Sequence, residues 1–135
     1  MAIRKPKGTQ DFLPEQIGNW HFIEQYMRDI CKTCGFNEIR TPVFEDTKLF
    51  LRGIGETTDV VQKEMYTFST GDHTDQTFTL RPENTASAVR AYLENKVYGK
   101  EGFTKWFSIG PMFRHDKPRA GRYRHFHHFV AEVLG

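Results

Sequence analysis

The sequence contains little cysteine. Only two of its 135 residues are cysteines, Cys31 and Cys34, in a C-x-x-C spacing. That spacing is typical of a redox pair or of half a zinc site, but a structural zinc site needs four ligands and no second such pair follows. Both cysteines also end an apolar helical pattern, where cysteine behaves as a small hydrophobic side chain. The sequence therefore favours a packing role for this pair.

Long apolar runs are also absent. No stretch approaches the ~18 consecutive apolar residues of a membrane helix. Residues 1–6 lack the apolar core of a secretory signal. We therefore expect a cytoplasmic protein with no membrane partner. The chain also lacks a large excess of positive or negative charge, since its formal net charge is only +2. Where the charged residues lie therefore matters more than their sum.

The composition is that of an ordinary globular protein, with 38% apolar and 27% charged residues. A chain of 135 residues is long enough for one domain with a real core, so we expect a single domain over residues 1–135. Twelve phenylalanines raise the aromatic content to 14%, which suggests a well-filled core or a stacking site.

The first half of the chain contains one clear helix. Residues 7–14 form a turn-rich, extended segment, and residues 15–34 then carry apolar side chains at helical spacing. Gly35 follows where a helix end favours a left-handed residue. Residues 36–44 predict a strand interrupted by Pro42, which places that strand at an edge, a bulge or an interface. A short helix is expected over 46–51, broken by Gly53 and Gly55.

The second half alternates strands and a helix. Strands are expected over 65–69 and 76–81, around the polar turn 70–75, and over 104–115 and 122–134, around the loop 116–121. Between these pairs, a helix begins near Asn84 or Thr85. Its expected apolar face consists of Ala88, Val89, Tyr92, Leu93 and Val97. These elements predict an α+β fold with a mainly antiparallel sheet flanked by helices.

Basic residues concentrate in the last hairpin. Arg114, Lys117, Arg119, Arg122 and Arg124 lie within eleven residues, opposed only by Asp116. Guanidinium groups at this density suit a polyphosphate or a nucleic-acid backbone, because each fork binds phosphate oxygens bidentately. The alternative is a charged, solvated hairpin tip.

Histidines follow directly. His125 and His127 share one face of the predicted strand, and His128 lies on the other. A zinc site would need a third ligand, so we predict no metal site. Glu132 lies on the same face as His128, flanked by apolar residues, where an unpaired carboxylate is costly. We expect Glu132 to meet a cation or a polar ligand, or that face to be wet.

Residues 79–85 join a strand to a helix N-terminus. Such a junction presents free N–H groups and the positive end of the helix dipole, which favour anions. Glu83 adds an acceptor for an amino group, and Thr85 adds a hydroxyl. Simple capping of the helix is the alternative.

These segments resemble those of a known family. Residues 110–127, from Gly-Pro-Met-Phe-Arg to the Arg-Tyr-Arg-His continuation, resemble motif 2 of the histidyl-tRNA synthetases, a branch of the class II aminoacyl-tRNA synthetases. Residues 7–14 resemble the N-terminal signature of that branch, and residues 80–85 its histidine-binding segment. Residues 35–44 resemble motif 1, which forms the dimer interface in the family. The resemblance covers essentially the whole chain.

The resemblance implies a ligase that converts histidine and ATP, with Mg²⁺, to histidyl-adenylate and then charges tRNA(His). Arg114 is implied as the catalytic residue that binds the ATP α-phosphate and the histidine carboxylate. The implied histidine-binding residues are Glu83, Thr85, Arg114, His128 and Glu132. Those for ATP and the tRNA acceptor end are Arg114, Asp116, Arg119, Arg122 and Tyr123. A homodimer through the motif 1 region is also implied.

The sequence departs from the family pattern at several positions. The family has glutamate at Asp116, glutamine at His125 and His128, and a small residue at Val130, so these changes concern amino-acid selectivity more than fold. The family's motif 3 would lie beyond residue 135, so we expect a truncated, N-terminal portion of the catalytic core without a complete active site.

Two other functions compete with the ligase. The family includes a histidine-binding regulatory subunit of ATP phosphoribosyltransferase, in which we expect a degraded motif 2 loop; the arginines retained here favour the ligase. A plain RNA-binding module would need no ATP and would bind less tightly as salt rises. The modest net charge argues against that module.

Overall fold

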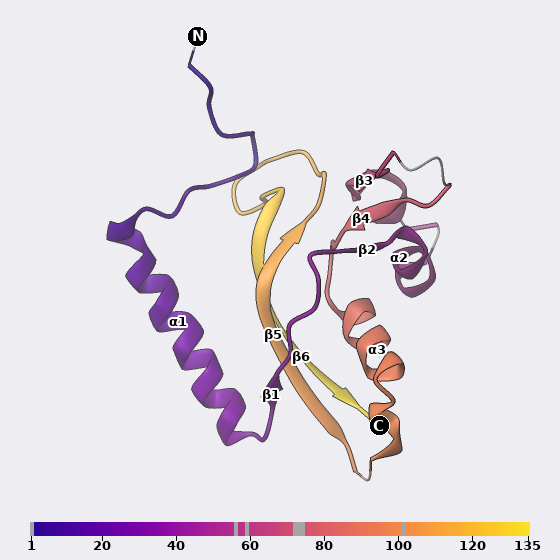
Figure 1. Cartoon of the computed structure of the whole chain (residues 1–135). Helices are drawn as coiled ribbons and strands as arrows, with labels where there is room; N and C mark the ends of the chain where they lie inside the picture. Colours follow the sequence, from indigo (N-terminus) through magenta and orange to yellow (C-terminus); the bar gives the residue numbers. More distant parts are fainter. Residues whose placement is uncertain (1, 56, 59, 72–74, 101) are drawn as a thin grey trace.

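The computed structural model describes residues 2–55, 57–58, 60–71, 75–100 and 102–135. Its elements divide into two three-stranded sheets with three α-helices around them. Figure 1 shows the long helix α1 on one side of a long central hairpin and the second sheet with α2 and α3 on the other. The α+β fold predicted from the sequence is confirmed, but the strands form two small sheets instead of one.

The central hairpin consists of β5 (Thr104–Phe113) and β6 (His125–Leu134). The two strands pair antiparallel over their whole length, from Thr104 opposite Leu134 to Phe113 opposite His125. Strand β1 (Asn37–Glu38) adds to β5 in parallel, which gives the order β1-β5-β6. Strict alternation gives the hairpin two faces, one covered by α1 and one turned toward α3.

The second sheet is smaller and antiparallel. It consists of β2 (Phe44–Asp46), β3 (Thr67–Phe68) and β4 (Phe78–Leu80), in the order β2-β4-β3. Phe44, Phe68 and Phe78 pack against one another on it in edge-to-face and tilted arrangements, with ring centroids 5.8–6.1 Å apart. Part of the turn predicted at 70–75 lies outside the described residues.

The helices begin and end where local chemistry dictates. α1 (Pro14–Thr33) starts with a proline in its first turn, and Gly35 beyond its end has a φ of +78°, as predicted. α2 (Thr47–Ile54) is capped by Asp46, whose carboxylate accepts from the Lys48 N–H. α3 (Thr85–Glu94) follows β4 directly. A π-helical turn η1 (Val60–Glu64) and a 3₁₀ turn η2 (Val97–Gly99) complete the helical elements.

The strand predicted over 36–44 was wrong in extent. It is two short strands in different sheets, β1 and β2, and residues 39–43 cross between them. Pro42 lies in this crossover, where its missing N–H costs no ladder hydrogen bond. Both strands are at the edges of their sheets, as the proline predicted.

Two helix predictions also need correction. α2 continues through Gly53 to Ile54, because Gly53 lets the helix approach α3: a Cβ there would lie 3.1 Å from the Ala86 Cβ. The buried face of α3 consists of small residues, Ala86, Ser87, Ala88 and Ala91. Val89 and Leu93, predicted to be buried, are exposed, because close packing of α3 selects for small side chains over large apolar ones.

α1 docks on the hairpin through an aromatic cluster. His127 of β6 lies against Trp20 of α1 (4.9 Å between ring centroids) and Phe12 just before it (5.7 Å). Phe12 and Trp20 also contact each other, at 4.5 Å. Cys31, near the end of α1, is buried, and burial raises the pKa of its thiol. That supports the packing role favoured by the sequence, while Cys34 is exposed.

Arg81 joins the two sheets. Its backbone N–H donates to the Val43 carbonyl (2.9 Å), and its own carbonyl accepts from Phe113 N–H (2.9 Å). Its side chain is 5% exposed and donates to the carbonyls of Pro111 (2.8 Å) and Thr41 (3.1 Å). One residue thus links β4, the crossover and β5.

We predict that Arg81→Met destabilises the chain by about 3 kcal/mol, because it leaves two partly buried carbonyls without this donor. Urea unfolding followed by circular dichroism measures the change. Arg40→Met is the matched control. Arg40 is exposed and forms a surface ion pair with Glu38, so its loss costs about 1 kcal/mol or less. Equal effects of the two substitutions would contradict the linking role of Arg81.

We predict a pH-dependent stability from His127. Burial, with a smaller contribution from His125, lowers the pKa of His127 below its ordinary 6.5, although Glu24 opposes the shift. The folded state therefore binds the proton less readily than the unfolded state. The stability that the packed, neutral His127 ring contributes is complete above pH 6.5 and is lost as the pH falls below it. An NMR titration should place the His127 midpoint below 6.5, and His127→Asn should lose less stability than the parent between pH 7 and pH 5. A midpoint above 6.5 would refute the prediction.

Candidate functional site

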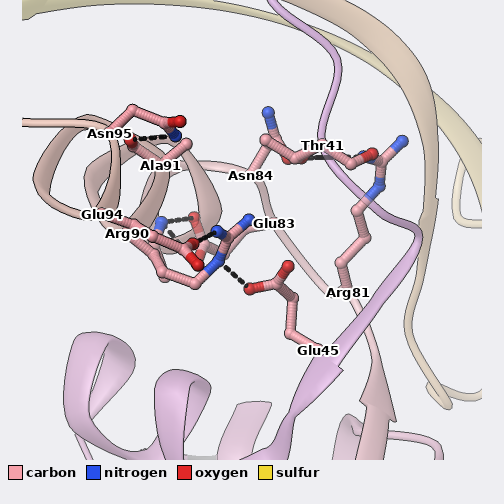
Figure 2. A network of polar contacts seen from close by, with 10 residues as sticks. Thr41, Glu45, Arg81, Glu83, Asn84, Arg90, Ala91, Glu94 and Asn95 are labelled. Atoms are coloured by element: carbon pink, nitrogen blue, oxygen red, sulfur yellow. Dashed lines mark hydrogen bonds and ion pairs between the residues drawn. The ribbon is translucent and has the colours of Figure 1, made fainter. Parts of the chain in front are cut away.

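The junction between β4 and α3 is held by a buried polar network. Asn84 accepts at its carbonyl oxygen from the Thr41 hydroxyl (2.7 Å) and from Arg81 (3.4 Å), and its amide donates to the Ser108 hydroxyl (2.8 Å). Figure 2 shows Arg81, Thr41 and Asn84 converging at this point. Because Asn84 is only 2% exposed, these bonds satisfy groups that water does not reach. The network fixes where α3 begins.

Glu83 caps α3. Its carboxylate accepts from the backbone N–H groups of Thr85 (2.5 Å) and Ala86 (3.2 Å). Asn84 is the N-cap residue and α3 begins at Thr85, as predicted. The Asn84 side chain makes no cap hydrogen bond, because the buried network occupies it. The capping alternative considered for Glu83 is therefore observed, and it holds the carboxylate at the positive end of the helix.

An ion pair fastens α3 to the second sheet. Arg90 donates from Nε to the Glu45 carboxylate (2.6 Å) and from Nη1 to Glu94 (2.5 Å). Figure 2 shows Arg90 between these two carboxylates. Glu45 is 8% exposed, so the pair compensates a carboxylate that would be costly to bury alone. The hydrogen bond to Glu45 raises the pKa of Arg90.

The five predicted histidine-binding residues gather beside the N-terminus of α3. The Thr85 hydroxyl donates to the Glu132 carboxylate of β6 at 2.5 Å. Arg114 lies just beyond β5, donates from Nε to the Pro82 carbonyl (3.0 Å) and covers the Phe126 ring at 5.4 Å. Desolvation first, and then the nearby Arg114 charge, lower the pKa of His128, while Glu83 opposes the shift. Residues from three elements thus share one surface.

This surface combines one cation and two carboxylates. Arg114 suits an anionic group, and Glu83 and Glu132 suit an amino group or a ring N–H, so the arrangement fits a small zwitterionic ligand. Glu132 accepts a hydrogen bond from the Thr85 hydroxyl within the chain. The cation or polar ligand expected for this carboxylate stays a prediction.

The arginine-bearing loop, residues 116–122, is organised by Asp116. Its carboxylate pairs with Arg122 (2.8 Å) and accepts from the Lys117 N–H (2.8 Å). Arg119, Arg122 and Tyr123 are exposed. Arg119 and Arg122 form a backbone bridge across the loop. A cleft of about 300 Å³ opens under the loop, lined by Arg114, Asp116, Gly121, Arg122, Tyr123, Phe126 and His127.

The histidines divide between the two faces of β6 as predicted. His125 and His127 lie on the α1 face with ring centroids 5.5 Å apart, and His128 lies on the α3 face. Within the described ranges, no three His, Cys, Asp or Glu side chains are grouped to hold a metal ion. None of the described helices is both long and apolar enough to cross a membrane.

The sequence did not reveal two features of the site. The first is the Arg81 network, because burial of an arginine with acceptors far along the chain leaves no local pattern. The second is an open groove of about 1130 Å³ between α2 and α3 that reaches Glu83 and Thr85. The exposed Val89 and Leu93 line it, and the sequence pattern does not distinguish apolar residues of a groove from those of a core.

A family model and curated relatives that match this chain belong to the histidyl-tRNA synthetases. A family model described as histidyl-tRNA synthetase matches residues 8–135. The chain is 55% identical to the histidine–tRNA ligase of Desulforamulus reducens over 135 residues, all of this chain and 32% of that protein. It is 53% identical to the Bacillus subtilis ligase over 136 residues, again 32% of that protein. The chain therefore spans about a third of the length of the curated relatives it matches.

Solved structures share the fold. The apo histidyl-tRNA synthetase of S. aureus superposes with a TM-score of 0.76 at 40% identity, over 96% of this chain and 28% of that one. An ATP phosphoribosyltransferase regulatory subunit/histidyl-tRNA synthetase from Bacillus halodurans gives a TM-score of 0.74 at 20% identity, over 96% of this chain and 32% of that one. The second likeness shows the fold alone.

We predict that Glu83→Ala lowers the free energy of unfolding by about 1 kcal/mol, because two N–H groups of α3 lose their acceptor. Glu83→Gln should lose less, since its amide oxygen still accepts. Glu15→Ala, at an exposed position in the first turn of α1, is the control and should change stability by about 0.5 kcal/mol or less. Thermal or urea unfolding of the variants tests this; a Glu83→Ala variant as stable as the control would rule out the cap.

Proposed function

Because the chain belongs to the histidyl-tRNA synthetase family, we propose that it supplies histidine- and ATP-binding residues to a histidine–tRNA ligase. In that reaction the histidine carboxylate attacks the α-phosphorus of ATP, and histidyl-adenylate forms with release of pyrophosphate. The histidyl group then passes to a terminal hydroxyl of tRNA(His) with release of AMP. The observation that carries the proposal is the gathering of Arg114, Glu83, Thr85 and Glu132 beside the N-terminus of α3.

Arg114 is the proposed catalytic residue. Its Nε is bound to the Pro82 carbonyl and its guanidinium lies over Phe126, so the group is held in place before any ligand arrives. A fixed cation stabilises the negative charge that develops on the α-phosphate oxygens as the carboxylate attacks, with little reorganisation at the moment of reaction. Phe126 provides a flat apolar surface at the same place, suited to a base or a ring.

The proposed histidine subsite uses the remaining residues. Glu83 receives the substrate amino group, Glu132 faces the imidazole with Thr85 beside it, and His128 borders the subsite from β6. Glu83 stays in position because the α3 backbone holds its oxygens. The His128 pKa is lowered, so a neutral ring stands next to the Arg114 cation above pH 6.5 without adding a second positive charge.

ATP enters as its magnesium complex, and the arginine-bearing loop is its proposed partner. Arg119, Arg122 and Tyr123 are exposed above the cleft that Arg114 and Phe126 line, in reach of a triphosphate or the tRNA acceptor end. Asp116 pairs with Arg122 and orients it toward the cleft. The regulatory-paralogue and RNA-binding alternatives explain this combination less well, since neither needs a carboxylate pair beside an arginine loop.

We also propose a homodimer through residues 35–44 and the adjacent helix. Phe22 and Tyr26 of α1 stack on each other (6.4 Å) yet are 72% and 61% exposed, which is costly in a monomer. They lie on the helix that leads into β1. The cytoplasmic location expected from the sequence stays a prediction.

The test is a hybrid in which this chain replaces the matching residues of the Bacillus subtilis ligase, assayed for ATP–pyrophosphate exchange with each of the twenty amino acids. We predict exchange with histidine alone. Arg114→Ala should reduce the rate roughly 10²–10³-fold, as expected for loss of a fixed transition-state cation.

Arg4→Ala is the matched control, because Arg4 is an exposed arginine in the extended segment before α1 and lies outside both the proposed site and the proposed dimer interface. It should leave the exchange rate unchanged. A folded hybrid that shows no exchange, or exchange with amino acids other than histidine, would refute the proposed function.

A further inference from the structure

The segment before α1 forms a tight turn. The Thr9 N–H and hydroxyl both donate to the Pro6 carbonyl, at 3.2 and 2.7 Å. Gly8 within this turn has a φ of +81°, a conformation that L side chains rarely adopt. The turn is therefore a defined structure, and Gly8 is suited to its place in it.

This turn grips the start of β6. The Gly8 carbonyl accepts from two successive N–H groups, those of Arg124 (2.7 Å) and His125 (3.2 Å). The Gly8 Cα lies so close to the Arg124 side chain that an added Cβ would be 2.7 Å from its Cγ. Both the backbone angle and the space at residue 8 therefore require glycine.

Arg124 connects the N-terminal turn to the arginine-bearing loop. Its Nε donates to the Asp116 carbonyl (3.0 Å), and its own carbonyl accepts from the Arg114 N–H (2.9 Å). Arg124 thus contacts the residue that organises the loop and the proposed catalytic arginine. With Nε committed to a backbone carbonyl, Arg124 has a structural task that distinguishes it from Arg119 and Arg122.

The same segment is anchored a second time, four residues later. Phe12 packs on His127 at 5.7 Å, and Trp20 of α1 packs on the same ring at 4.9 Å. Residues 8 and 12 therefore contact β6 at 124–125 and at 127. Two attachment points hold the turn against the strand more rigidly than either alone.

We propose that the N-terminal turn, residues 6–9, is a clamp that sets the position of the arginine-bearing loop, residues 116–122, with Gly8 as a positioning residue acting through Arg124. Its effect on ATP binding rests on the proposed function. Its effect on the loop does not.

The first test compares Gly8→Ala with Gly71→Ala by amide hydrogen exchange. Gly71 has the same φ of +81°, but an added Cβ there meets no described atom within 4 Å, so it matches the backbone strain without the contact. We expect Gly8→Ala to speed exchange at the loop residues 116–122 roughly tenfold, since a left-handed alanine disfavours the clamped conformation by about that factor. Gly71→Ala should leave these residues unchanged.

A second variant guards against loss of folding in Gly8→Ala. Arg124→Met keeps the packing of the side chain but removes the donor to the Asp116 carbonyl, so it should loosen the loop to a similar degree. Adding Gly8→Ala to Arg124→Met should then loosen the loop by less than the product of the two single effects, because both act through one path. Full protection of the loop in both single variants would overturn the clamp.

The hybrid ligase supplies the functional readout. Gly8→Ala should raise the KM for ATP roughly tenfold while the KM for histidine changes less than twofold, because small displacements of a positioning group act on the ligand it positions. A general loss of structure would raise both constants, and equal changes would overturn the proposal. If the parent hybrid shows no histidine-dependent exchange, the proposed function fails. The amide hydrogen exchange of the loop in the Gly8 and Arg124 variants then still tests whether the N-terminal turn is a clamp.

Discussion

The structure depends on one buried cation, Arg81, whose hydrogen-bond partners among the described residues are all neutral. The Arg81 guanidinium is 5% exposed, and its hydrogen bonds go to the Thr41 and Pro111 carbonyls, the Thr41 hydroxyl and the Asn84 amide oxygen. Burial lowers its pKa, and the charge of Glu45 opposes that shift only in part. The buried charge is tolerated because neutral acceptors from three segments of the chain hydrogen-bond to it. The same hydrogen bonds tie these three segments to one another.

Everything at the candidate site follows from that junction. Because Arg81 and Asn84 are fixed, the chain can turn from β4 into α3 within a few residues, which leaves Glu83 and Thr85 at the start of the helix. Glu83 then satisfies the helix N–H groups, and Thr85 reaches Glu132 on the hairpin. The capping role and the proposed binding role of Glu83 are compatible, since the hydrogen bonds that cap the helix also keep its carboxylate from rotating away.

The sequence predicted the parts of this structure whose signals are local. The helix ending at Gly35 and the β5–β6 hairpin were found because periodicity and turn residues mark them over ten or more positions. The split of residues 36–44 between two sheets was missed, since two strands of two and three residues are too short to carry a pattern. The small buried face of α3 was missed because Val89 and Leu93 outweigh alanine in any apolar pattern. The resemblance grouped Glu83, Thr85, Arg114 and Glu132 as candidate binding residues, and their binding role stays a prediction. Residue chemistry alone left capping and binding as equal alternatives for Glu83.

The two faces of β6 have separate tasks, and the register of the hairpin keeps them apart. Phe126, His128 and Glu132 face α3, and His125 and His127 face α1 and the segment before it. A slip of one residue would exchange these sets and place Phe126 or His128 where His127 now meets the aromatic cluster. The long antiparallel ladder resists such a slip from within, and the contacts of Phe12 and Trp20 with His127 resist it from outside. The geometry of the site on one face is therefore set in part by packing on the other, through residues that need touch no substrate.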